Sequence, residues 1–165
     1  MYMMKVRNFL LIVLFMCMCT AVVCSTGTID DLVEKATQGD ADAQYDLGDL
    51  YYYGEEVEQD YEKAVYWYTL AAEQDDVDAQ WRLGVCYQYG TGVVQDYEKA
   101  VYWYTLAAEQ GDVNAQYNLG ACYRYGMGVE EDYEEAIYWY TLAAEQGDEH
   151  AQNTLNDLKS TISGI

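Results

Sequence analysis

The chain contains no proline, only two phenylalanines, one histidine and few basic residues. Without proline, no helix has to break at a missing N–H group or at a ring clash. Eight Lys and Arg face 29 Asp and Glu, which gives a formal charge of −21. Nucleic-acid binding needs clustered Lys and Arg against the phosphates, so this balance argues against a nucleic-acid partner. It also argues against binding to an anionic membrane surface and favours a solvated, soluble exterior.

Catalytic and metal-binding signatures are missing as well. The sequence has no HExxH, GxSxG or phosphate-binding loop, no paired-cysteine zinc spacing and no D-x-D-x-D-G calcium loop. The single histidine, His150, is predicted to lie on a helix surface. Carboxylates are abundant, but abundance alone does not place an acid with a raised pKa beside a base. We therefore expect no enzymatic activity, no cofactor and no bound metal.

The first 24 residues differ in character from the rest. Two basic residues precede an apolar run, Phe9–Val23, that is broken by a single threonine. Such a run is too short for a comfortable membrane span and is typical of a secretory signal peptide. We predict that residues 1–24 export the protein to a secreted, periplasmic or luminal location, with cleavage after Cys24 or near Ser25–Gly27. An uncleaved membrane anchor and lipidation at Cys24 are the alternatives.

Three of the five cysteines fall within this predicted signal peptide, which leaves Cys86 and Cys122. These two lie at equivalent positions of neighbouring repeats. Equivalent atoms of stacked helices are about 8–10 Å apart, whereas a disulfide needs Cα atoms within about 7 Å. We predict two unpaired, buried thiols that act as small core residues.

One segment of 15 residues occurs three times at a spacing of 36 residues. Asp96–Gln110 repeats Asp60–Gln74 letter for letter, and Asp132–Gln146 differs only at Glu135 and Ile137. A fixed period of this size is typical of a solenoid built from stacked helical units. The predicted fold is therefore an all-α solenoid of antiparallel helix pairs.

Each repeat is expected to contain a first helix, helix A, and a second helix, helix B. Helix A is predicted to begin after an N-cap aspartate and to end at a glycine, over Ala41–Tyr53, Val77–Tyr89 and Val113–Tyr125. Helix B follows the aspartates Asp60, Asp96 and Asp132. The chain then divides into a linker and N-terminal capping helix at 25–38, repeats at 39–74, 75–110 and 111–146, and a partial repeat with a C-terminal capping helix at 147–165.

The partial repeat is predicted to form a terminal cap. Asn153 and Asn156 replace an aromatic residue and a glycine, while Leu155 and Leu158 remain apolar. A cap needs one face that packs on the stack and another that meets water. The last residues, Ser160–Ile165, are expected to fray.

Positions that are identical in the copies predict the core. In helix A these are Ala43, Gln44, Leu47, Gly48 and Tyr51 with their counterparts, and in helix B they are Ala64, Trp67, Tyr68 and Ala71 with theirs. A glycine inside a helix costs about 1 kcal/mol relative to alanine. We therefore expect Gly48, Gly84 and Gly120 to allow a close approach between helices A and B.

Positions that differ among the copies form another stripe of helix A. In solenoids of helix pairs the A helices line the concave side, so this stripe is the predicted site for a peptide or protein. Its members are Asp46, Asp49, Tyr52, Arg82, Val85, Gln88, Asn118, Ala121 and Arg124, with Asp42, Asp78 and Asn114 one turn earlier. The alternative is a solvated surface that varies because nothing constrains it.

A second candidate surface lies on helix B. Tyr66, Tyr102 and Tyr138 point away from the core stripe and are flanked by Leu70, Leu106 and Leu142. An exposed column of this kind on the convex side would serve as a contact or self-association surface. A half-buried seam between repeats is the alternative.

The repeated pattern resembles a known family. The residues are Asp112-x-x-Ala115-Gln116-x-x-Leu119-Gly120-x-x-Tyr123-x-x-Gly126-x-Gly128-Val129-x-x-Asp132-x-x-x-Ala136-x-x-Trp139-Tyr140-x-x-Ala143-Ala144-x-x-Gly147. They resemble the Sel-one-like repeat, a relative of the tetratricopeptide repeat, in register from about Gly39 to Gln152. The chain departs from the family at Glu56 and Asp75, which replace glycines, and at the three leucines of the helix B column.

This resemblance implies a right-handed superhelix and a scaffold or adaptor role. Some exported, cysteine-rich relatives are linked to β-lactam hydrolysis, but they carry disulfide-bridged cysteine pairs within each repeat. Here only two repeats have a cysteine, one each. A β-lactam hydrolase-like protein is therefore the remote alternative.

The predicted function is an exported, non-enzymatic scaffold that binds a peptide or protein on the A-helix face. The main alternative is a structural module that self-associates through the Tyr/Leu column, and the sequence leaves the oligomeric state open. Arg82→Glu with Arg124→Glu should abolish the first function, and Tyr102→Asp with Leu106→Asp the second.

Overall fold

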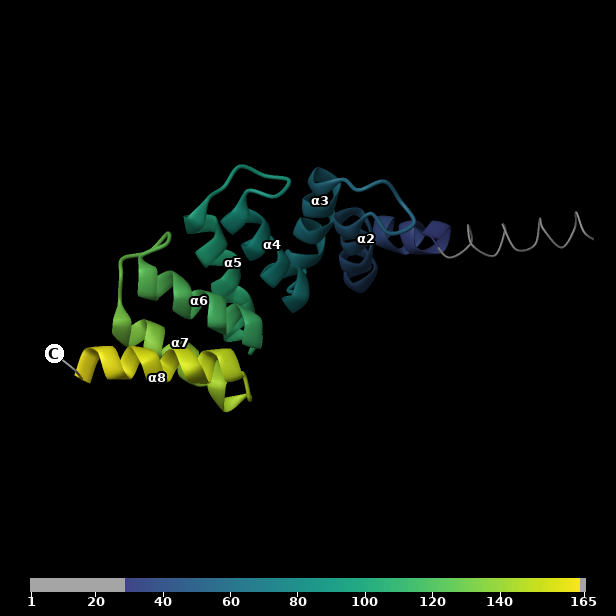
Figure 1. Ribbon diagram of the computed structural model, residues 1–165. Coiled ribbons are helices and arrows are strands. Elements are labelled where there is room, and N and C mark those ends of the chain that lie inside the picture. The colour runs from purple at the N-terminus through teal and green to yellow at the C-terminus, as the bar shows by residue number, and fades with distance from the viewer. Residues whose placement is uncertain (1–28, 164–165) are drawn as a thin grey trace, which may run out of the picture.

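The computed structural model describes residues 29–163, and every regular element in that range is a helix. A helix at 29–37 precedes α2 (Ala41–Tyr53), α3 (Tyr61–Ala72), α4 (Val77–Tyr89), α5 (Tyr97–Glu109), α6 (Val113–Tyr125), α7 (Tyr133–Glu145) and α8 (Glu149–Ser163). The pairs α2–α3, α4–α5 and α6–α7 stack in sequence along a curved path that ends at α8 (Figure 1). The right-handed, all-α solenoid is confirmed. The predicted signal peptide, residues 1–24, and the linker before residue 29 lie outside the described residues.

Aspartates begin the helices, and glycines end the A helices, as predicted. The Asp40 and Asp76 carboxylates accept the backbone N–H groups of Ala43 and Ala79 at 2.8 and 2.7 Å. Asp112, Asp60, Asp96, Asp132 and Asp148 cap their helices in the same way. Gly54, Gly90 and Gly126 end α2, α4 and α6 in the left-handed conformation. These caps satisfy N–H and C=O groups that a helix end otherwise leaves unpaired.

Asp75 shows why one departure from glycine is tolerated. It has φ of 66°, whereas Gly111 and Gly147 at the equivalent position have 96° and 95°. A Cβ atom built on either glycine would meet nothing within 4 Å, so only the backbone conformation selects the residue there. Aspartate reaches the left-handed region more readily than most residues, and its cost at this position is small.

The glycines inside the A helices do allow close packing against helix B. A Cβ on Gly48, Gly84 or Gly120 would lie 2.6, 2.4 or 3.0 Å from a tyrosine ring of the same repeat. Those rings belong to Tyr68, Tyr104 and Tyr140, which are almost fully buried. The absence of a side chain on helix A is therefore what admits a whole aromatic ring between the helices.

The predicted core stripe of helix B needs one correction. Trp67, Trp103 and Trp139 are only half-buried, while Val65 and Val101, outside the predicted stripe, are 8% exposed. The tyrosine that follows each tryptophan occupies the space over the glycine and fills the core. The indoles instead pack at its border, against the neighbouring repeat.

Buried glutamines connect each repeat to the helix before it. Gln80 Nε2 donates to the Ala72 carbonyl at 3.3 Å, and its Oε1 accepts from Gln110 Nε2 at 2.9 Å. The same two bonds recur around Gln44 and Gln116. The invariant glutamine thus has a packing role, because it gives a helix-end carbonyl, which already accepts one backbone N–H, a second hydrogen bond and ties two repeats together.

The two thiols and the C-terminal cap follow the predictions in most respects. Cys86 and Cys122 are free and buried, and burial raises the pKa of each thiol to about 12. Leu155 and Leu158 are buried, whereas Asn153 and Asn156 are exposed. The expected fraying from Ser160 is wrong: α8 continues to Ser163, with two hydroxyls bonded to the Asp157 carbonyl.

The curvature places the A helices on the inner side of the solenoid. Helix α4 packs directly against α6 of the next pair, which is expected of helices on the inner side of such a stack. Helices on the inside of a bend are drawn closer together than those on the outside. In the part of the chain that the structure describes, no helix has the length and apolarity required to cross a membrane.

Candidate interaction surface

Most of the predicted site residues lie at the joints between helix pairs and are not freely exposed. Of the nine, Asp46 is exposed, and the other eight are half-buried: Asp49, Tyr52, Arg82, Val85, Gln88, Asn118, Ala121 and Arg124. Val85 and Ala121 pack against the apolar clusters of their repeats. The polar members gather around the hydroxyl groups of the three buried tyrosines of helix B.

At the first joint the hydroxyl partner is a charged pair. The Tyr68 hydroxyl donates to Asp49 Oδ1, and the Arg82 guanidinium lies against the same carboxylate, with Nη2 3.4 Å from Oδ2. Arg82 Nε is 3.3 Å from Oδ1 but is not aligned for a hydrogen bond. The side chains of Arg82 and Asp49 are 15% and 26% exposed, so this ion pair is partly removed from solvent.

Aromatic rings enclose the other sides of Arg82. Its guanidinium carbon lies 5.6, 5.3 and 5.0 Å from the ring centroids of Tyr52, Tyr53 and Trp81. Such contacts are favourable because the face of an aromatic ring is electronegative. Burial opposes the charge, but hydrogen bonding to Tyr45 and the field of Asp49 raise the pKa of Arg82 overall.

At the second joint the same hydroxyl has neutral partners. Tyr104 donates to Gln88 Oε1 at 2.6 Å. Burial raises the pKa of Tyr104, and a hydrogen bond from the Asn118 amide lowers it in part. The acceptor has thus moved one turn along helix A, from the position of Asp49 to that of Gln88, while Val85 occupies the position of Asp49.

At the third joint the polar partner is a cation. Burial raises the pKa of Tyr140, and the Arg124 guanidinium beside it opposes that rise. Arg124 also lies 5.2 Å from the centroid of the Tyr125 ring. The side chains of Arg82, Gln88 and Arg124 are therefore engaged in contacts within the solenoid. A ligand would have to bind the polar atoms of these side chains that the contacts leave unpaired.

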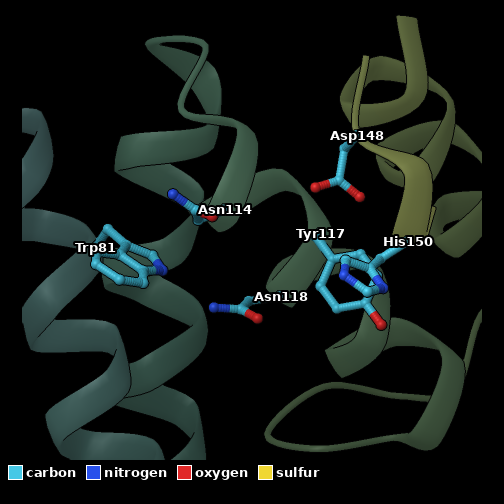
Figure 2. A pocket seen from close by; sticks show the side chains of 6 residues that line it. All are labelled: Trp81, Asn114, Tyr117, Asn118, Asp148 and His150. Carbon is cyan, nitrogen blue, oxygen red and sulfur yellow. The ribbon is translucent and has the colours of Figure 1, made fainter. Parts of the chain in front are cut away.

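An open groove lies along the inner face, where three successive A-type helices meet. Its volume is about 310 Å³, and Figure 2 shows its six lining residues: Trp81, Asn114, Tyr117, Asn118, Asp148 and His150. Trp81 comes from α4, the next three from α6, and His150 from α8, with Asp148 as its N-cap. Asn118 belongs to the predicted site, and Asn114 lies one turn before it.

Comparing the copies of the repeat did not identify four members of this surface: Trp81, Tyr117, Asp148 and His150. Two of them carried a signal, because Trp81 is the only tryptophan in an A helix, where the other repeats have tyrosine, and His150 is the only histidine. The exposed position of His150 on a helix surface agrees with its prediction. Its proximity to Asn118 depends on the curvature of the stack, which one repeat alone does not reveal.

The tyrosine column on the other face is exposed as predicted. Tyr66, Tyr102 and Tyr138 are 58%, 57% and 54% exposed, and each lies edge-on to the tryptophan that follows it. The flanking leucines Leu70, Leu106 and Leu142 are half-buried. Within residues 29–163, no group of three or more His, Cys, Asp or Glu side chains is placed to hold a metal ion.

Fold and surface together define a helical-repeat solenoid whose inner face carries polar and aromatic side chains. The Sel1 repeat family matches residues 41–76, 77–112 and 113–148, and the chain belongs to this family. Sel1 repeats generally form non-catalytic scaffolds for protein–protein interaction. Among curated proteins, no sequence matches this chain.

Three solved structures are similar to this chain. The protein c5321, a protective antigen of uropathogenic Escherichia coli with an SLR fold, is 44% identical with a TM-score of 0.79, over 81% of this chain and 28% of its own. A Sel1 repeat protein from Oxalobacter formigenes is 40% identical with a TM-score of 0.73, over 79% and 98% of the two chains. Cysteine rich protein B of Helicobacter pylori is 22% identical with a TM-score of 0.62, over 79% and 93%, and shows the fold alone.

The chain thus spans little more than a quarter of the E. coli protein.

Proposed function

We propose that the protein is an exported, non-enzymatic scaffold that binds a peptide or another protein on the inner, A-helix face. The observation that supports this most is the groove, because it collects aromatic and amide side chains from three successive helices. Such side chains combine apolar contact with hydrogen bonding, which suits recognition of a polypeptide.

The B-helix side supports a second candidate function, self-association. Its three tyrosines recur once per helix pair, and each is more than half exposed. A second copy of the chain would bury them at an interface. The two candidates use opposite sides of the solenoid and can be separated by position.

Charge reversal at Arg82 and Arg124 is a poor test of the first function. Arg82→Glu would place a second carboxylate beside Asp49, so a loss of binding could not be separated from a loss of packing. Asn114 is exposed, and its side chain makes no hydrogen bond in the described part of the chain, which makes it the better position.

Site-specific photo-crosslinking tests the proposal. A photoreactive phenylalanine analogue replaces Asn114 on the inner face, Tyr102 on the outer face, or Val94, an 87% exposed loop residue that serves as the background control. The full chain is irradiated in the cells that make it, and adducts are identified by mass spectrometry. We expect adducts with another protein from Asn114 only. Self-adducts from Tyr102 alone would favour self-association, and adducts no stronger than those from Val94 at both positions would overturn both candidates.

Export rests on the apolar run Phe9–Val23 and its basic flank. Mass spectrometry of the purified mature protein tests it, since cleavage near Ser25 removes the run. A retained N-terminus would instead support an anchor, and a lipid mass on Cys24 would support lipidation.

A further inference from the structure

The buried tyrosine at the third joint lacks the hydrogen-bond acceptor that its two counterparts have. The Tyr68 hydroxyl donates to Asp49, and the Tyr104 hydroxyl donates to Gln88. Tyr140 is equivalent to both and is 1% exposed, but its hydroxyl donates to no acceptor in the described part of the chain. Its oxygen is not sealed from solvent, unlike the unpaired indole nitrogens of the solenoid. A group from outside the chain can therefore reach this donor.

The sequence of α6 explains the difference between the joints. The two acceptor positions of helix A lie one turn apart, at Asp49 and Gln88, and in the third repeat they are occupied by Ala121 and Arg124. Alanine has no polar side-chain atom, and arginine only donates hydrogen bonds. Burial raises the pKa of Tyr140, and the Arg124 guanidinium beside the hydroxyl opposes that rise. Two donors therefore lie side by side where the other joints have a donor and an acceptor.

Arg124 is itself without a carboxylate partner. Within residues 29–163, the ion pairs involve Lys63, Arg82 and Lys99, and none involves Arg124. Its guanidinium carbon lies 5.2 Å from the centroid of the Tyr125 ring. Contact with an aromatic face leaves the N–H groups in the guanidinium plane able to donate. A half-buried arginine with no ion pair is unexpected in a chain with 29 acidic residues.

The first joint shows which group such a pair of donors holds. There the Asp49 carboxylate accepts from the Tyr68 hydroxyl and lies against the Arg82 guanidinium. A carboxylate accepts several hydrogen bonds at once, and bonds from charged donors are the stronger ones. At the third joint Ala121 replaces that aspartate, so the carboxylate would have to come from a different molecule.

We infer that the third joint is an anion site that binds one carboxylate group from outside the chain. The Tyr140 hydroxyl and the Arg124 guanidinium are its donors, and the small side chain of Ala121 leaves the space for it. The large negative charge of the protein repels polyanions, so a single carboxylate fits better than a phosphate chain or a nucleic acid. The carboxylate belongs to a small organic acid or to an acidic side chain of another protein. The site shares no residue with the groove and goes beyond the proposed function.

NMR of the arginine side chains tests the inference. The chain has only three arginines, Arg7, Arg82 and Arg124, so arginine-to-lysine variants assign their Nε–H signals. Sodium acetate is titrated into the purified protein and replaces sodium chloride at constant ionic strength. We expect the Arg124 signal to shift and saturate, while the Arg82 signal stays in place because Asp49 already occupies that guanidinium.

Matched variants locate the bound carboxylate. Tyr140→Phe should weaken acetate binding about tenfold, as expected for one lost hydrogen bond to a charged group. It should leave the melting temperature unchanged, because the hydroxyl has no acceptor in the chain to lose. Tyr68→Phe is the control: it should leave acetate binding unchanged and lower the melting temperature, because it breaks the bond to Asp49.

An internal carboxylate should compete with the external one. Ala121→Asp places a carboxylate at the position equivalent to Asp49, so the response of the Arg124 signal to acetate should be lost. A response equal to that of the parent would show that acetate does not bind in the space over Ala121 and would contradict the site.

A second titration separates the two sources of the carboxylate. N-acetylglutamic acid α-amide presents a glutamate side chain with its flanking peptide groups. Tighter binding than that of acetate would assign the site to an acidic side chain of a partner, and equal or weaker binding would assign it to a small organic acid.

The inference falls if the Arg124 signal does not saturate, if the Arg82 signal shifts equally, or if Tyr140→Phe binds acetate as well as the parent. None of these outcomes bears on the scaffold function, because the crosslinking position Asn114 lies in the groove and outside this site.

Discussion

The first and second joints of the solenoid contain the same helix B, yet they satisfy its buried tyrosine differently. The segments Asp60–Gln74 and Asp96–Gln110 are identical in sequence. Tyr68 nevertheless donates to a carboxylate that an arginine neutralises, whereas Tyr104 donates to a glutamine amide. All of this difference comes from helix A.

This comparison shows what the variable stripe does. A buried hydroxyl needs a partner, but either of two positions one turn apart on helix A can reach it. When Asp49 supplies the acceptor, a cation is needed nearby, and Arg82 of the next repeat fills that position. When Gln88 supplies it, Val85 and Asn118 suffice. The variable residues therefore change as sets, one set for each joint.

The largest expected effect is at the charged joint. Asp49→Ala removes the acceptor of Tyr68 and the carboxylate that faces Arg82, so we expect a loss of about 2–4 kcal/mol in unfolding free energy. Urea denaturation measures it. Asp46→Ala, at an exposed position one turn away, is the matched control and should stay within about 0.5 kcal/mol. Equal effects of the two changes would show that the joint network adds no stability.

Transplanting the charged pair sharpens the comparison. Val85→Asp alone places an unpaired carboxylate at a half-buried position of the second joint, and Asn118→Arg supplies its partner. We expect the double variant to be more stable than the sum of the two single changes by about 1–2 kcal/mol. A double-mutant cycle in urea gives this coupling. A coupling near zero would mean that the two sets are not exchangeable units.

The neutral joint should be less sensitive than the charged one. Gln88→Ala leaves the Tyr104 hydroxyl with the Asn118 amide as its remaining neighbour and creates no unpaired charge. We expect a loss of about 1–1.5 kcal/mol, measured by the same denaturation. A loss larger than that of Asp49→Ala would reverse the proposed ranking of the joints.

The smallest effect concerns an N-cap at the second joint. Burial and the charge of Asp78 raise the pKa of Asp112 above its ordinary value of 3.8. Folding therefore disfavours the ionised form, and this group's contribution to stability rises as the pH falls from 7 through its folded-state pKa. Asparagine caps a helix equally well.

Asp112→Asn should therefore gain less than about 1 kcal/mol at pH 7. The difference from the parent should shrink toward pH 4. Thermal unfolding across this range measures it, and a variant that is less stable than the parent at pH 7 would contradict the assignment.

Periodicity and turn chemistry predicted most of the fold. These features are local or occur in several copies, so that one copy supports another. They are the bounds of α2, α4 and α6, the aspartate caps, the glycines beneath the tyrosines and the free, buried thiols. The prediction that both Trp67 and Tyr68 lie in the core was wrong for the tryptophan, because only the tyrosine ring fits in the space over Gly48.

The sequence by itself determined the repeat, the helix pairs and their caps, because these depend on residues close together in the chain or one period apart. It also identified the positions that vary. Only the tertiary structure decided how those positions are used, because the curvature of the stack brings Asp49 to Arg82 and Trp81 to Asn118 and His150. Contacts between repeats depend on the angle at which one helix pair packs on the next, and that angle results from many side chains acting together.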